Sequence, residues 1–295
     1  MIDSRLDPED AEQLARHLTW MRRRGLSPRT IDSRQKIITR LALATAHGAV
    51  RADAADLDAW RGELDGLLLA AGTIAFYVVH VREWYRWLAH TGVRDENPAE
   101  GLPVPRQPKY LPRPIPEDDL ALALDHADPD IRLMLVLSGW CGLRAAEIAG
   151  LRWESVTLTG SRRIIVGADT AKGRKERVVP LSEWAASEIR RYQARTGSPG
   201  RGWVFARRDG NPGQIRPVRV SQMVNCYLAE IGVAGHLHMG RHRFATQALA
   251  VSHDLRVVQE LLGHSSPSVT AVYTAYDTEY AGSVVDALPQ PEAVS

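Results

Sequence analysis

The sequence predicts a mainly helical protein of the α+β class, with a helical N-terminal domain and a second domain that adds a small β-sheet. Three observations support this fold class. Apolar residues recur at helical spacing through the first 96 residues, seven prolines interrupt residues 97–116, and two short strand-like segments follow within a helical remainder. A length of 295 residues is enough for two domains that each bury a hydrophobic core.

Four helices are predicted before residue 97. Residues 7–10 combine a capping carboxylate, a proline at the first helical position and acidic side chains in the first turn, so a helix begins there and ends near Gly25. A second helix starts at residues 27–28 for the same reasons, and a third lies within 53–65.

The fourth helix has one clear apolar face and ends near Gly92. This face consists of Ile74, Tyr77, Val78, Val81, Tyr85 and Leu88. We therefore expect residues 1–96 to form a small helical domain.

Residues 97–116 form the predicted interdomain linker. Its prolines are Pro98, Pro103, Pro105, Pro108, Pro112, Pro114 and Pro116. Proline at this density favours an extended, semi-stiff chain because it breaks helices and central strands. Arg106, Lys109 and Arg113 make the linker positively charged, so it is suited to cross a phosphate backbone. The second domain then covers residues 117–295, with its predicted helices at 117–126, at 129–141 and over most of the chain after 182, and its strands at 163–166 and 177–180.

Bulk properties exclude several classes of protein. Cys141 and Cys226 are the only cysteines and form no CxxC pair, which excludes a disulfide framework and fits a reducing compartment. Apolar runs stay below the roughly 18 residues that a membrane span needs, and the acidic, polar N-terminus differs from a secretory signal. We expect a soluble cytoplasmic protein without a membrane partner.

The formal net charge of +2 says little about partners, but its distribution is uneven. Between residues 201 and 219, the single acid Asp209 accompanies five arginines, which are Arg201, Arg207, Arg208, Arg216 and Arg219. Such a run is either a phosphate-binding patch or a solvated loop, and composition does not separate the two.

The first segment that carries chemistry is CGLRAAEIAGLRW. Gly142 closes one helix and Arg144 lies where the next one opens, so its guanidinium stands at a helix N-terminus, where anions bind readily. Glu147, one turn later, can orient the Arg144 guanidinium or a neighbour. The alternative is a surface ion pair at i,i+3 spacing, which is the commoner arrangement for this segment taken alone.

The second segment is IIVGADTAKGRKERVVPL, which predicts a β-hairpin with Lys172 near its tip. A lysine there can reach into a groove and protonate a leaving oxygen if its pKa is lowered. Lys175 and the flanking arginines are alternatives for plain phosphate contact.

The third segment is HLHMGRHRFATQAL, in which His238 and Arg241 share one helix face. The expected buried side of this helix carries Phe244, Ala245 and Ala248. Histidines are frequent between residues 236 and 264, yet there is no HExxH and no nearby cysteine pair, so we expect no metal site.

The fourth segment is LRVVQELLGHSSPSVTAVYTAY. Gly263 ends a helix, His264 follows it, and Tyr273 lies two turns into the next helix, which begins at residues 266–267. Taken alone, this segment also fits the helix-turn-helix of a transcription factor. The second helix, however, offers no Arg, Lys, Asn or Gln with which to read bases.

Together, in this order and spacing, the four segments resemble the catalytic domain of the tyrosine recombinases, the phage integrase and Xer-type enzymes. The resemblance assigns the catalytic residues Arg144, Lys172, His238, Arg241, His264 and Tyr273, supported by Glu147 and His242. Gly240, where the family more often has Leu, and Ala275, where many Xer-type members have His, depart from the pattern without removing a reacting group.

The resemblance also implies an activity and an architecture. A helical, SAM-like core-DNA-binding domain and the catalytic domain form a clamp around double-stranded DNA. Tyr273 attacks a phosphodiester, a 3′-phosphotyrosyl intermediate forms, and strands are exchanged through a Holliday junction without metal, ATP or other cofactor. The protein is a monomer in solution and a homotetramer at specific DNA sites, in the cytoplasm of a bacterium or phage host, associated with the nucleoid. Its role is integration, excision or resolution, as in mobile elements.

Two other functions remain open at the level of sequence. A type IB topoisomerase-like enzyme shares the chemistry, and a non-catalytic helix-turn-helix regulator shares only the helices and the charge. Within the recombinase hypothesis, Tyr276 and Tyr280 follow Tyr273 closely, and Lys175 rivals Lys172 as general acid.

Overall fold

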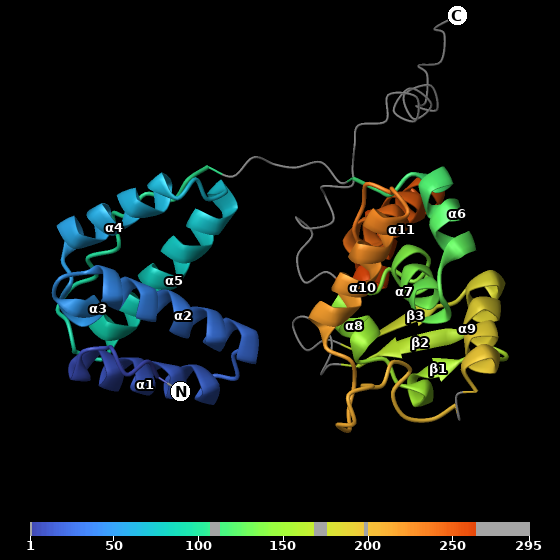
Figure 1. The fold of residues 1–295 in the computed structure, drawn as a ribbon, viewed down its shortest axis with the longest axis horizontal. Helices are drawn as coiled ribbons and strands as arrows, with labels where there is room; N and C mark the ends of the chain where they lie inside the picture. Colours follow the sequence, from blue (N-terminus) through green and yellow to red (C-terminus); the bar gives the residue numbers. More distant parts are fainter. Residues whose placement is uncertain (1, 107–112, 168–175, 198–199, 264–295) are drawn as a thin grey trace, which may run out of the picture. The chain divides into compact units, whose positions relative to one another are not determined.

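A computed structural model describes residues 2–106, 113–167, 176–197 and 200–263. The chain divides into two compact units, Met1–Lys109 and Tyr110–Ser295. In the described residues the chain is mainly helical and has one small antiparallel sheet, so the predicted fold class is confirmed (Figure 1).

The N-terminal unit is built only of helices in its described part. They are α1 (Pro8–Arg23), α2 (Pro28–Ala44), α3 (Gly48–Arg51), α4 (Ala54–Gly66) and α5 (Ala71–His90).

Local capping explains where α1 and α2 begin. The Asp7 carboxylate accepts from the Glu9 amide, and the Ser27 hydroxyl accepts from the Thr30 amide. The four-residue α3 is not predicted by the sequence, because its amides are capped from another helix. The carboxylate of Asp10, on α1, accepts from the amide of Val50 at 2.7 Å.

The core of this unit is formed mainly by α1, α2, α4 and α5. The predicted apolar face of α5 is buried at Ile74, Val78, Val81, Tyr85 and Leu88. The start of the proline-rich segment also belongs to this unit. Leu102 is buried in the core, and its carbonyl accepts from Arg82 Nη2 at 2.6 Å.

The C-terminal unit combines helices with the sheet. Its helices are α6 (Glu117–His126), α7 (Pro129–Gly139), α8 (Ala145–Ala149), α9 (Glu183–Thr196), α10 (Pro217–Glu230), α11 (Leu237–Ser252) and α12 (Leu255–Leu262), with one 3-10 turn at Trp153–Ser155. The central helix is α7, which is buried on all sides from Leu133 to Gly139 and packs against α9, α10 and α11.

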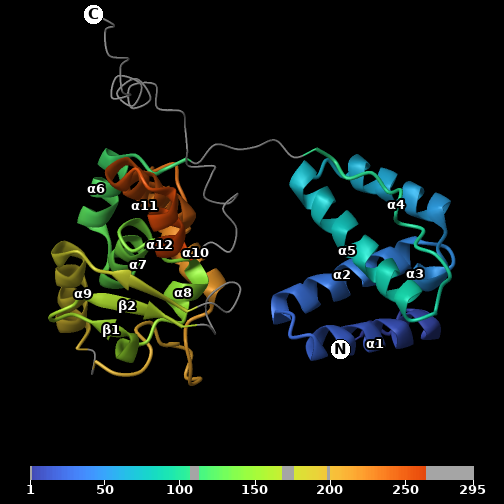
Figure 2. The same cartoon turned by 180° about the vertical axis from the view of Figure 1, so that it is seen from behind.

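Three antiparallel strands form the sheet in the order β1-β2-β3, where β1 is Val156–Thr157, β2 is Arg163–Val166 and β3 is Arg177–Pro180. The predicted hairpin strands are β2 and β3, and Ile164 pairs with Val179, both fully buried. β1 lies at the end of the unit away from α6 (Figures 1 and 2). Within the described ranges, no helix is both long and apolar enough to span a membrane.

Candidate active site

Arg144 lies at the turn where the sequence predicts it. The chain leaves α7 through Gly142, whose φ of +63° belongs to the left-handed region, and Arg144 is then the N-cap residue of α8. A side chain at Gly142 would meet Phe244 of α11 at 2.5 Å, so glycine also permits the close approach of these two segments. The side chain of Arg144 keeps 22% of its surface exposed.

Glu147 is the shared counter-ion of three arginines. Its side chain is 0% exposed and accepts from Arg144 Nη1 at 2.9 Å. Arg177 binds both carboxylate oxygens, each at 2.8 Å, and Arg241 Nη1 lies 3.8 Å from Oε2. The alternative of a surface ion pair is therefore wrong for Arg144 and Glu147, because the carboxylate is buried among several guanidinium groups.

Arg144 and Arg241 also bind the C-terminal end of α12. The carbonyl oxygen of Leu262 accepts from Arg144 Nη1 at 3.3 Å and from Arg241 Nη2 at 2.8 Å. The last carbonyls of a helix lack intrahelical donors and carry partial negative charge, so they suit cationic partners. The two arginines expected to hold a phosphate therefore meet at Leu262, which lies two residues before His264 in the sequence.

Arg177 is the residue of this cluster that the sequence does not single out. By sequence it is only one of the arginines that flank the hairpin. In the structure it is 7% exposed, and its Nε donates to the Leu261 carbonyl at 3.0 Å. One signal could have identified it: strand alternation places Arg177 on the same inward face as Val179. A buried arginine at the start of a strand needs an anionic partner.

Burial and hydrogen bonding change the pKa of Glu147 in opposite directions. Desolvation by burial raises the pKa of this carboxyl, but the hydrogen bonds and positive charge of Arg177, the Arg144 amide and the charge of Arg241 outweigh it. The net pKa lies below the usual 4.5, so Glu147 is ionised at neutral pH. Its contribution to stability is present above about pH 4.5 and is lost as the pH falls through the lower folded-state pKa.

We expect Glu147→Gln to lower the free energy of unfolding by about 3 kcal/mol, because a buried ion-pair network loses its anion while its cations remain. Urea denaturation followed by circular dichroism at pH 7 measures this change. Asp209→Asn is the control, since Asp209 pairs with Arg207 at the surface and its loss should leave the midpoint unchanged. Equal midpoints for Glu147→Gln and the unmodified protein would contradict the shared counter-ion.

Helix α11 supplies His238, Arg241 and His242. Arg241 is 1% exposed and donates to the Gly142 carbonyl as well as to Leu262. The rings of His238 and His242 lie edge to face, with centroids 4.6 Å apart. The departure at Gly240 has a physical reason, because a Cβ at this position would lie 2.9 Å from Ser138 Oγ on α7. Leucine would not fit between α7 and α11.

The pKa of His238 is expected to lie near 4. His238 has exposed surface, but neighbouring atoms partly desolvate its ring, and this lowers its pKa most. Repulsion by His242, Arg241, His236 and Arg144 lowers the pKa further. The ring is therefore neutral at pH 7. Because the unfolded state takes up this proton near pH 6.5, stability falls as the pH drops from about 6.5 towards 4.

A proton NMR titration of the imidazole tests this value. In Arg144→Ala one of the repelling charges is gone, so the midpoint of His238 should move upward. A midpoint at 6.5 in the unmodified protein would show that neither desolvation nor the surrounding positive charges lower the pKa of this ring.

The other predicted site residues lie outside the described residues. These are Lys172, His264 and Tyr273, together with the alternatives Lys175, Tyr276 and Tyr280. By sequence, Lys172 lies between β2 and β3, and His264 follows Gly263 directly. Among the residues that are described, no group of three or more His, Cys, Asp or Glu side chains could hold a metal ion.

The arginine-rich run is partly solvated and partly the rim of a groove. Arg207 pairs with Asp209, and Arg208 pairs with Asp130 at 2.7 Å. Arg216 and Arg219 are exposed at the start of α10 and line an open groove together with polar and apolar side chains. The solvated-loop interpretation therefore applies to Arg207 and Arg208, and phosphate binding by Arg216 and Arg219 stays a prediction.

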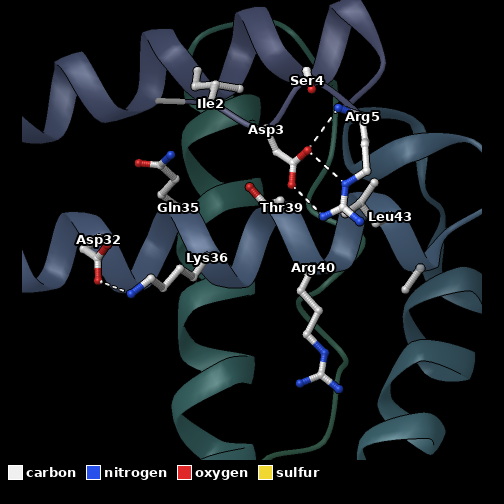
Figure 3. Close-up of a pocket in the computed structure, with 11 residues that line it drawn as sticks. Ile2, Asp3, Ser4, Arg5, Asp32, Gln35, Lys36, Thr39, Arg40 and Leu43 are labelled. Carbon is white, nitrogen blue, oxygen red and sulfur yellow. Dashed lines mark hydrogen bonds and ion pairs between the residues drawn. The ribbon is translucent and has the colours of Figure 1, made fainter.

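Another open pocket lies in the N-terminal unit, between the first residues and α2 (Figure 3). Its charged side chains are largely paired with one another. Arg5 binds Asp3, and Lys36 binds Asp32 at 2.8 Å. The charged groups of this pocket do not converge on a common point as the arginines do at Glu147, so it is not the candidate active site.

Known proteins match this chain over most of its length. The Phage integrase family matches residues 115–279. The tyrosine recombinase XerC of Xylella fastidiosa strain M23 is 34% identical over 276 residues, which cover 90% of this chain and 92% of that protein. The XerC of Chromobacterium violaceum is 32% identical over 285 residues, with 93% of each chain covered.

Solved structures share the fold at lower identity. An integrase of the transposon Tn1549 in complex with transposon right end DNA has a TM-score of 0.73 at 16% identity, covering 93% of this chain and 98% of that one. A lambda integrase dimer bound to a core site has a TM-score of 0.71 at 15% identity, covering 89% and 76%. The family match and the XerC relatives show that this chain belongs to the phage integrase family of tyrosine recombinases.

Proposed function

We propose that the protein is a site-specific DNA recombinase that cleaves and rejoins DNA through a covalent 3′-phosphotyrosyl intermediate at Tyr273. One observation supports this most strongly: Arg144 and Arg241 meet at the Leu262 carbonyl, directly before the segment that carries His264 and Tyr273. Transfer of a phosphoryl group builds negative charge on the non-bridging oxygens, and preorganised cations stabilise that charge.

The proposed reaction balances without a metal or ATP. The Tyr273 oxygen attacks phosphorus and loses its proton, while the bond from phosphorus to the 5′ oxygen breaks and Lys172 protonates the leaving oxygen. His238, neutral at pH 7, can accept the tyrosine proton or a hydrogen bond, and His264 assists. Rejoining reverses these steps with a 5′ hydroxyl of another strand, because the phosphotyrosyl bond conserves the energy of the phosphodiester.

The two arginines contribute differently in this proposal. Arg144 has exposed surface and is therefore the guanidinium that a phosphate can reach in this arrangement. Arg241 is buried, so its charge acts on the phosphate without direct contact while its hydrogen bonds hold the Gly142 turn against the end of α12. Glu147 and His242 support these cations.

For the domains, we propose a core-DNA-binding domain at 1–96, a linker at 97–116 and a catalytic domain at 117–295, which together clamp double-stranded DNA. The described N-terminal unit supports DNA contact, since Arg22, Arg23 and Arg24 at the end of α1 and Arg29 at the start of α2 are all exposed. Clustered exposed arginines favour phosphate contacts. On its sites the protein forms a homotetramer from monomers, exchanging strands through a Holliday junction at the bacterial nucleoid in the cytoplasm.

A plasmid assay separates this proposal from its alternatives. Repeated sequences that flank the gene are the first candidate sites, and two copies are placed on one supercoiled plasmid. A recombinase deletes or inverts the DNA between them and leaves a protein–DNA adduct on a nicked site. A topoisomerase-like enzyme relaxes the plasmid without rearranging it, and a regulator binds without forming an adduct. Relaxation or binding alone would therefore overturn the proposed function.

A further inference from the structure

Arg177 connects three segments that the proposed chemistry uses. It begins β3, the strand that follows the segment containing Lys172. Its Nη1 and Nη2 bind the two oxygens of Glu147, and its Nε binds the carbonyl of Leu261 on α12. One buried guanidinium thus contacts the counter-ion of Arg144 and the helix that ends two residues before His264.

The hydrogen bonds of Arg177 fix the orientation of the Glu147 carboxylate and hold it against the end of α12. With both Glu147 oxygens engaged, the carboxylate plane is fixed, and that plane sets where Arg144 Nη1 is bound. Gly263 permits the close approach, because a Cβ there would lie 2.9 Å from Arg177 Cδ. A planar guanidinium can make these bonds in fixed directions, whereas an ammonium group acts as a point charge.

We propose that Arg177 is a positioning residue for DNA cleavage: it holds Glu147 and the end of α12 in one arrangement and thereby sets the positions of Arg144 and Arg241. It touches no reacting atom in this role. The inference rests on the proposed function, since it concerns the rate at which the same site cleaves DNA.

The test compares Arg177→Gln with a matched variant elsewhere in the same unit. Arg132 also binds a largely buried glutamate through two nitrogens, with Nε at 2.6 Å and Nη2 at 3.0 Å from Glu188. Arg132→Gln therefore removes a similar ion pair between α7 and α9, away from the cluster at Glu147. Both variants are assayed below their melting temperatures, at saturating concentrations of a nicked site, for the single-turnover rate of adduct formation.

We expect Arg177→Gln to cleave roughly 10²-fold more slowly than Arg132→Gln, the size of loss that a misplacement of about 1 Å causes in other enzymes. DNA affinity should be equal in the two variants. Arg177→Lys keeps the charge but not the fork, so it should recover only part of the rate.

The cleavage rate measured as a function of pH separates a positioning role from a general loss of stability, which would not shift the acidic limit of the profile. Without Arg177, burial acts on Glu147 with less opposition, so its pKa rises and cleavage should fail at a higher pH on the acidic side. Arg132→Gln should keep the profile of the unmodified protein. Equal cleavage rates for Arg177→Gln and Arg132→Gln, or full recovery by Arg177→Lys, would overturn the positioning role. Absence of any adduct with the unmodified protein would instead contradict the proposed function itself.

Discussion

Tyr273→Phe is expected to abolish the covalent protein–DNA adduct, because the hydroxyl oxygen that would form the phosphotyrosyl bond is removed. Loss of a covalent nucleophile costs on the order of 10⁶-fold in kcat in a well-studied protease, so no adduct should be detectable. Denaturing gel electrophoresis of the protein incubated with a nicked, end-labelled site measures this directly. DNA binding should persist, since phenylalanine retains the aromatic ring.

Tyr276→Phe and Tyr280→Phe are the matched controls for that experiment. Both tyrosines lie within the same short stretch of sequence, and the choice of Tyr273 among them depends on its spacing of nine residues from His264. Both control variants should form the covalent adduct at the same rate as the unmodified protein. If Tyr273→Phe still forms adduct while Tyr276→Phe does not, the nucleophile has been assigned three residues too early in the sequence.

Arg144→Ala is expected to slow cleavage by roughly 10²–10³-fold, the loss that follows removal of one donor that stabilises an oxyanion. Arg241→Ala is expected to slow it by roughly 10²-fold, because the buried Arg241 holds the Gly142 turn that carries Arg144. Each variant removes a cation from the pair that meets at Leu262. Single-turnover adduct formation measures the rate, and gel-shift titration measures DNA affinity, which should change little because many other arginines remain to contact phosphates.

The two variants should differ in stability. Arg241 is almost fully buried and Arg144 is partly exposed, so Arg241→Ala is expected to melt at the lower temperature. Arg195→Ala, at an exposed position on α9, is the control for both rate and stability. Loss of DNA binding in step with cleavage would point to a purely structural role for the pair.

Much of the fold could be predicted because its elements begin and end through local interactions. The Asp7 and Ser27 caps, the apolar face of α5 and the alternation of β2 and β3 involve residues close in sequence, and each matches its predicted place. The four-residue α3 could not be predicted this way, because its cap comes from Asp10, which lies 40 residues from Val50.

Within the site, the sequence correctly placed Arg144 at a helix N-terminus, because the Gly142 turn and the helix start are local features. The choice of Arg144, His238 and Arg241 as catalytic residues stays a prediction. Strand alternation could indicate that Arg177 is buried, but only the tertiary structure showed that Glu147 is buried and is the partner shared by Arg144, Arg177 and Arg241. The deciding contacts join residues far apart in the chain, 30 positions for Arg177 with Glu147 and 118 for Arg144 with Leu262. A buried charge is stable only beside oppositely charged or hydrogen-bonding partners, and tertiary packing, not proximity in the sequence, brings those partners together.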